Sequence, residues 1–327
     1  MTWFSRSIAL WLVLFGSAVL LCDAGRHQCD SKRFQALNQD EHVCDIITRY
    51  VPVDVQLHLG WRRTSDILRA LHRPRHLQWI EYFCGTGQLS LALSSVLPRG
   101  QSFDLVCGGV GHDILTTQGF AAMLDAALQL VPFALAWFAP PCSLWIFLSA
   151  GVHKRTVMRP SGDTSRPDVV ANNRIVHRCC VLMRILTARL VQWVCEQPVT
   201  SLLFQFGSFL KLRTSAQMHI LSSKLRRKFV WLGHWGGAIP KPTVLWGITP
   251  IFDVLFSVRP QTRRKASVNK TTKKTIIKNG RPCVVYRIYG VRKTLKNSQS
   301  YPKDFCIEFA GHLKRVYDKS LGMLVPA

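Results

Sequence analysis

Acidic residues are scarce in this chain of 327 residues. It contains 18 Asp and Glu against 43 Lys and Arg, a formal net charge of +25. This shortage argues against a cationic partner and favours a polyanion, nucleic acid first and an anionic membrane surface second. Internal repeats and low-complexity tracts are also lacking, and 48% of the residues are apolar. A disordered chain is therefore excluded, and the length suffices for one full core.

Short, regular cysteine spacings are absent as well. The 11 cysteines include no C-x-x-C pair, and Cys179 and Cys180 are adjacent. These spacings exclude a disulfide framework and the usual structural zinc site, so no metal is expected. Buried thiols in a reducing compartment are the better interpretation.

The beginning of the chain lacks an apolar run of the roughly 20 residues that span a bilayer. The uncharged run after Arg6 covers residues 8–22, and Cys22 and Ala24 stand at positions −3 and −1 of a cleavage site. Residues 1–25 are therefore predicted to be a signal peptide, with a short signal anchor or a misjudged start codon as alternatives. This leader indicates the secretory pathway or a membrane anchor, and it is the only expected membrane contact. A secretory location conflicts with the reducing compartment that the cysteines favour.

From residue 77 onward, short apolar runs alternate with helical patterns. The alternation predicts βαβ units and a Rossmann-like α/β fold, with helices on both faces of a parallel or mixed sheet. Ligands of such sheets bind at the carboxyl ends of the strands. Strands are expected at 77–83, around Phe103, at 133–138 and at 191–195, and helices at 89–97, 119–131 and 172–190.

Composition divides the chain into five segments. They are the leader, an N-terminal extension at 26–76, the α/β domain at 77–258, a basic segment at 259–300 and a closing helix within 301–327.

The basic segment carries 13 Lys or Arg and no acid between Arg259 and Lys296, and residues 283–289 alternate like a strand. We expect it to contact phosphates, with a solvated basic linker as the alternative. The candidate nucleic-acid-binding residues are Arg263, Arg264, Lys265, Lys273, Lys274, Arg287, Arg292 and Lys293.

Two motifs carry candidate chemistry, and the first is a glycine turn. Phe83, Gly85 and Gly87 follow an expected strand, where glycines let the backbone turn tightly and approach a ligand. The third glycine of the dinucleotide fingerprint is missing. Asp104, after the second strand, is placed to accept hydrogen bonds from ribose hydroxyls. A simple strand-to-helix turn and a surface carboxylate are the alternatives.

The second motif is Pro140-Pro141-Cys142, directly after another expected strand. The two prolines fix the chain, so Cys142 has a rigid position at the mouth of the sheet. A nearby positive group would lower its pKa and make it a nucleophile. The basic loop with His153, Lys154, Arg155 and Arg159 is the candidate source of that charge. A buried thiol after a turn is the alternative.

Together these motifs resemble the 5-cytosine DNA methyltransferases, and more closely the divergent methyltransferase-like proteins of dinoflagellates. The resemblance covers residues 77–317. It rests on F-C-G-T-G, the acid after the second strand, A-P-P-C-S, the W-x-x-E-x-P-x-x-S pattern at Trp193, Glu196, Pro198 and Ser201, and a closing segment with Tyr301, Phe305, Phe309 and Ala310.

The resemblance implies a methyltransferase fold that binds S-adenosylmethionine. Phe83, Gly85 and Gly87 would line the methionine end of the cofactor, Asp104 would hold the ribose, and Asp113 would lie beside the adenine. It further implies a nuclear monomer that acts on DNA rather than RNA.

The implied catalytic residues are Cys142 and Glu196. Cys142, as a thiolate, would add to carbon 6 of a flipped cytosine. Glu196 would contact the ring nitrogen and stabilise the enamine that takes the methyl group at carbon 5.

The chain departs from the family at two points. Gln197 and Pro198 follow Glu196 where the family has Asn-Val, and Gln-x-Arg-x-Arg is missing. Two alternatives therefore stay open. One is a catalytically inactive nucleic-acid-binding relative, derived from a mobile element, and the other is a secreted or membrane-anchored relative.

Overall fold

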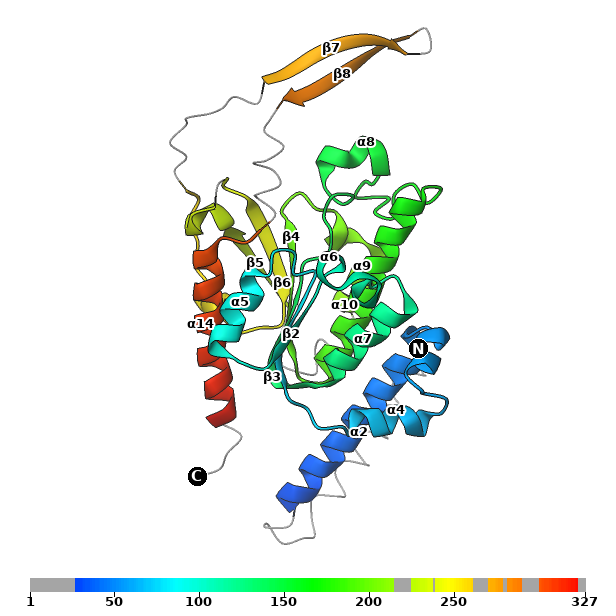
Figure 1. Cartoon of the computed structure of the whole chain (residues 1–327), viewed down its shortest axis with the longest axis vertical. Coiled ribbons are helices and arrows are strands. Elements are labelled where there is room, and N and C mark those ends of the chain that lie inside the picture. The colour runs from blue at the N-terminus through cyan, green and yellow to red at the C-terminus, as the bar shows by residue number, and fades with distance from the viewer. Residues whose placement is uncertain are drawn as a thin grey trace, which may run out of the picture.

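The protein is built around one mixed sheet of six strands, in the order β2-β1-β3-β4-β6-β5 (Figure 1). Strands β1 to β4 are mutually parallel, whereas β6 runs antiparallel to both β4 and β5. The strands are β1 Leu77–Tyr82, β2 Gly100–Phe103, β3 Leu130–Phe138, β4 Gln192–Pro198, β5 Arg226–Trp231 and β6 Pro242–Gly247. The expectation of an α/β fold with a mixed sheet is confirmed.

The computed structural model describes residues 27–214, 225–237, 239–260, 270–278, 281–289 and 300–322. The predicted leader lies outside them. For residues 27–38 and for 270–278 and 281–289, the backbone is described without the side chains.

Helices cover both faces of the sheet because side chains alternate along each buried strand. Ile80 and Phe138 face one hydrophobic core, whereas Trp79 and Trp137 face a second. The first core is covered by α2 His27–Tyr50, α3 Val53–His58, α4 Thr64–Leu71, α7 Thr117–Leu128, α9 Pro167–Ala188 and α10 Gly207–Thr214, and the second by α5 Gln88–Val96, α12 Ile251–Val254 and α14 Lys303–Gly322 (Figure 1). Two single turns, α6 Leu105–Gly108 and α8 Ala150–His153, lie in loops.

The boundary between α7 and β3 differs from the prediction. The helix expected at 119–131 ends at Leu128, and the strand begins at Leu130. Pro132 therefore lies inside the strand. It is tolerated there because the register between β1 and β3 shifts near this point and Phe133 adopts a positive φ of 63°.

A separate antiparallel pair is formed by β7 Lys270–Lys278 and β8 Arg281–Tyr289. The predicted strand at 283–289 lies within β8. Of the candidate phosphate-contacting residues, Lys273 and Lys274 are on β7 and Arg287 is on β8, without described side chains. Arg263, Arg264, Lys265, Arg292 and Lys293 lie outside the described residues.

Candidate active site at the carboxyl edge of the sheet

The two motifs meet at the point where the sheet order reverses. From β1 the chain passes to β2 on one side and then to β3 on the other side of β1. The helices that follow β1 and β3, α5 and α9, therefore lie on opposite faces of the sheet, and open α/β sheets bind ligands at such a point. Phe83 and Gly85 follow β1, and Pro140 and Cys142 follow β3.

The glycine turn has an unusual backbone conformation. Phe83, Gly85 and Gly87 all have positive φ, at 64°, 54° and 69°. A Cβ added at Gly85 or Gly87 would meet no atom within 4 Å. The turn thus exposes backbone beside open space, where a ligand could approach it closely.

Asp104 connects the glycine turn to the loop after β2. Its Oδ2 accepts a hydrogen bond from the Gly85 amide at 2.8 Å, and its Oδ1 accepts one from the Val106 amide at 2.9 Å. A carboxylate has about four acceptor sites, so capacity remains for two ribose hydroxyls. Asp113 instead caps its own turn, because its Oδ1 accepts from the Leu115 amide at 2.9 Å.

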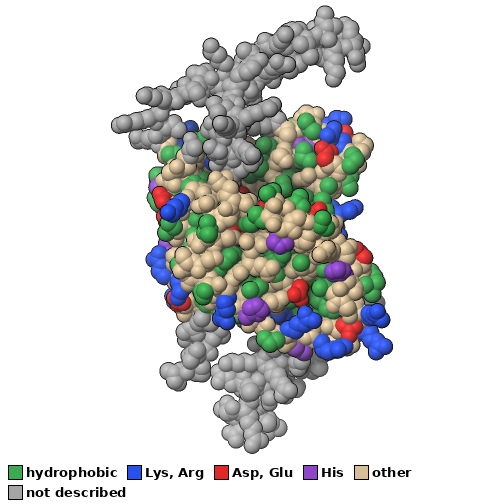
Figure 2. All heavy atoms as spheres, in the orientation of Figure 1, with side chains coloured by type: hydrophobic (Ala, Val, Ile, Leu, Met, Phe, Trp, Pro, Cys, Tyr) green, Lys and Arg blue, Asp and Glu red, His purple; other side chains and the backbone are tan. Residues whose placement is uncertain are grey.

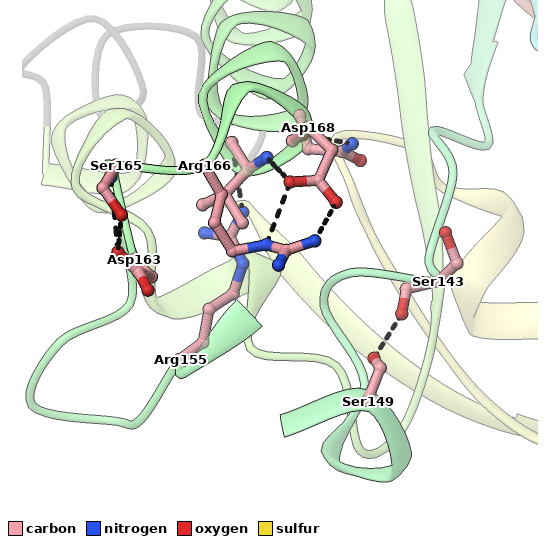
Figure 3. A network of polar contacts seen from close by, with 9 residues as sticks. Ser143, Ser149, Arg155, Asp163, Ser165, Arg166 and Asp168 are labelled. Atoms are coloured by element: carbon pink, nitrogen blue, oxygen red, sulfur yellow. Dashed lines mark hydrogen bonds and ion pairs between the residues drawn. The ribbon is translucent and has the colours of Figure 1, made fainter. Parts of the chain in front are cut away.

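The loop that follows Cys142 is held by a dense polar network (Figure 3). Arg155 is buried and donates to the carbonyls of Leu144 at 2.7 Å and Pro160 at 2.6 Å, and its guanidinium lies 3.6 Å over the Trp145 ring. Hydrogen bonds from Ser149 to Ser143 and from Arg166 to Asp168 close neighbouring turns. These contacts therefore fix the conformation of the loop after Cys142.

The source of positive charge near Cys142 is not the one expected from the sequence. Arg155 is engaged with backbone carbonyls, and Lys154 pairs with Asp163 at 3.0 Å. The cation that acts on Cys142 is Lys241, just before β6. Burial and the Glu196 carboxyl raise the pKa of the Cys142 thiol, and Lys241 lowers it.

Glu196 is buried at the end of β4, and its two oxygens differ. Oε2 accepts a hydrogen bond from the Tyr301 hydroxyl at 3.3 Å. Oε1 lies 4.0 Å from Lys241 Nζ and has no hydrogen-bond partner among the described residues. Burial raises the pKa of Glu196, whereas Lys241 and the Tyr301 hydroxyl lower it. A buried oxygen without a hydrogen-bond partner, on a carboxyl close enough to raise the pKa of Cys142, is an arrangement that a polar ligand would complete.

Gln197 joins the end of β4, which carries Glu196, to the loop that carries Cys142. Its side chain is fully buried, with Nε2 donating to the Pro140 carbonyl at 2.6 Å and Oε1 accepting from Ser201 at 2.9 Å. The departure from the family's asparagine therefore leaves a supporting amide in place.

Sequence reasoning missed a third acid, Glu81 on β1. It is fully buried, accepts a hydrogen bond from Ser90, and burial raises its pKa to about 7. An acid inside the apolar run at 77–83 is the signal that could have identified it. Lys241 carried no comparable signal, since its position depends on the pairing of β6 with β4.

In the part of the chain that is described, no cluster of His, Cys, Asp and Glu could hold a metal ion. The same residues include no helix long and apolar enough to cross a bilayer.

On the face in Figure 2, Lys and Arg of the described residues lie in separate groups near the edges. The polar groups of the candidate site itself are the carboxyl of Glu196, the thiol of Cys142, the amide of Gln197 and the ammonium group of Lys241.

Compared with known protein families, with curated proteins and with solved structures, the chain matches none.

Proposed function

We propose that this protein transfers a methyl group from S-adenosylmethionine to carbon 5 of cytosine in DNA. One observation carries the proposal. The hydrogen bond from Gln197 to Pro140 ties the loop of Cys142 to the end of β4, where Glu196 lies, beside the glycine turn at the switch point of the sheet. A nucleophile, an acid and a ligand-binding turn are the components that the motif resemblance implies.

Each residue has a role that its surroundings support. The Cys142 thiol gives its proton to solvent, and the thiolate sulfur forms a bond to carbon 6 of the flipped base while the electron pair of the carbon 5–carbon 6 double bond moves toward the ring nitrogen. Glu196, whose pKa is raised by burial, donates a hydrogen bond to that nitrogen when it is protonated. When bound, S-adenosylmethionine supplies an electrophilic methyl group. Water then takes the proton from carbon 5, the electron pair of that bond re-forms the carbon 5–carbon 6 double bond, and the Cys142 sulfur leaves carbon 6 as a thiolate that regains its proton from solvent.

The glycine turn and Asp104 would hold the cofactor. Gly85 and Gly87 present backbone without a Cβ, and Asp104 has free acceptor capacity. The basic segment at 259–300 would hold the DNA backbone, with an affinity that falls as salt is raised.

A direct product assay tests the proposal. The full chain is incubated with duplex DNA and S-adenosylmethionine, and the nucleosides are analysed by mass spectrometry. We expect 5-methylcytosine with the wild type and with Cys107→Ser, which changes an exposed cysteine. Cys142→Ser should form none. Product that persists in Cys142→Ser would refute the assigned nucleophile.

The raised pKa of Cys142 favours a second function, an inactive nucleic-acid-binding relative. A thiol that stays protonated at neutral pH is a poor nucleophile. That function predicts DNA binding without any 5-methylcytosine.

A further inference from the structure

Tyr301 reaches the candidate site from the C-terminal part of the chain. Its hydroxyl donates to Glu196 Oε2 at 3.3 Å and accepts a hydrogen bond from Trp137 Nε1 at 3.0 Å. All three side chains are buried. Residues from β3, β4 and the segment before α14 thus form one hydrogen-bonded chain.

The position of the Tyr301 hydroxyl is fixed by packing on both sides of the ring. The ring meets that of Trp137 edge-on at 5.7 Å, and Lys241 Nζ lies 5.6 Å from its centre. Phe305, one turn into α14, packs against both aromatic rings. The ring therefore has little freedom to turn its hydroxyl away from Glu196.

The Trp137 and Tyr301 side chains act in turn as hydrogen-bond donors. An indole N–H can only donate, so Trp137 occupies an acceptor site of the Tyr301 oxygen, and the hydroxyl proton points to Glu196 Oε2. With the Tyr301 proton on Oε2, Oε1 is the oxygen that can carry the proton of a neutral Glu196. That oxygen is the one without a partner among the described residues.

We infer that Tyr301 is a positioning residue, which holds Oε2 of Glu196 and thereby presents Oε1 as the hydrogen-bond donor to the base. The inference rests on the proposed function for the identity of the ligand. The arrangement of the three side chains is independent of it. The C-terminal segment is thus part of the site, although Tyr301 is 105 residues from Glu196 in sequence.

Other groups face Glu196 and must be separated from the effect of Tyr301. Lys241 and the Thr243 hydroxyl lower the pKa of Glu196, and Cys142 and Cys195 lie close enough to feel its charge. Burial raises the pKa of Tyr301 well above its ordinary value, so the hydroxyl keeps its proton across the neutral range.

The test measures the ionisation of Glu196 itself. The chain contains four glutamates, Glu41, Glu81, Glu196 and Glu308, so carbon-13 labelling of glutamate gives four carboxyl signals. Glu196→Gln identifies the signal of Glu196. Tyr301→Phe keeps the ring and removes the hydroxyl, and it should shift the Glu196 titration to higher pH. Tyr317→Phe, at a buried tyrosine within α14, should leave the Glu196 titration unchanged.

A second substitution acts in the opposite direction. Fluorotyrosine at position 301 makes the hydroxyl a stronger donor, and it should shift the Glu196 titration to lower pH. An unchanged titration in both variants would overturn the inference. Shifts in opposite directions would support the positioning role even if the wild type made no 5-methylcytosine, so the two proposals can fail separately.

Discussion

Gln197 Nε2 donates a hydrogen bond of 2.6 Å to the carbonyl oxygen of Pro140. This bond joins the ends of β3 and β4, two residues before Cys142 and one residue after Glu196. Because Pro141 has no amide N–H and fixes the backbone, the Pro140 carbonyl sets the direction in which the chain continues to Cys142. The relative position of the two candidate catalytic residues thus depends on one amide.

Gln197→Ala should cost about 1–3 kcal/mol of unfolding free energy, because it leaves a buried carbonyl and the Ser201 hydroxyl without their partner. Urea unfolding measures the loss. The exposed Gln205 provides a matched control, and Gln205→Ala should change stability by at most about 0.5 kcal/mol. Equal losses in the two variants would contradict the role given to Gln197.

Glu81 should make the protein less stable as pH rises. Its folded-state pKa is raised to about 7 from 4.5, so its contribution is fully present below about pH 4.5 and is lost as pH rises through about 7. The difference corresponds to about 3 kcal/mol.

This contribution is measured by urea unfolding at several pH values. Glu81→Gln should remove that part of the decline, whereas Glu41→Gln, at an exposed position, should retain it. Identical pH profiles for wild type and Glu81→Gln would show that the buried acid is not perturbed.

Lys241→Met should make Cys142 less reactive. Lys241 lowers the pKa of Cys142, so its removal raises that pKa and reduces the thiolate fraction at any given pH. The rate of alkylation of Cys142 by iodoacetamide, followed by peptide mass spectrometry, should fall and its pH profile should move to higher pH. Lys319→Met, on the exposed surface of α14, is the control and should behave as wild type. If the pH profile of alkylation were the same in Lys241→Met and wild type, Lys241 would have no effect on the ionisation of Cys142.

Gly85→Ala should weaken the binding of S-adenosylmethionine. The positive φ of 54° strains any side chain at this position, and the added methyl group fills the open space beside the turn. Gly60→Ala is a close control, because Gly60 also has positive φ and open space but follows α3, away from the switch point. Both variants should lose about 1 kcal/mol of stability. Calorimetric titration should show weaker binding for Gly85→Ala alone, and equal affinities would contradict a cofactor role for the turn.

The central strands were predictable because each is a short, mainly apolar run that ends at a Gly- or Pro-containing turn. Strands β1 and β3, with the loops of Gly85 and Cys142, follow this rule. Strand β5 does not, since Arg226, Arg227 and Lys228 occupy its first half at the edge of the sheet. Edge strands can carry charge because one side faces solvent. The periodicity of apolar residues therefore did not predict the antiparallel hairpin of β5 and β6.

The surroundings of the candidate site were less predictable, because they depend on contacts between distant segments. Lys241 approaches Glu196 through the pairing of β6 with β4, and Tyr301 approaches it through the packing of α14 on α5 and β3. The basic loop after Cys142 was the nearest source of charge in sequence. Arg155 in this loop instead donates hydrogen bonds to the backbone carbonyls of Leu144 and Pro160, and these bonds hold the loop.

Covalent trapping on DNA that contains 5-fluorocytosine tests the central claim most directly. Fluorine at carbon 5 cannot leave as a proton does, so the bond between Cys142 and carbon 6 persists once methyl transfer has occurred. The account predicts a denaturation-resistant adduct that requires S-adenosylmethionine, is mapped to Cys142 and is lost in Cys142→Ser. A wild-type protein that binds this DNA and the cofactor but forms no adduct would contradict it.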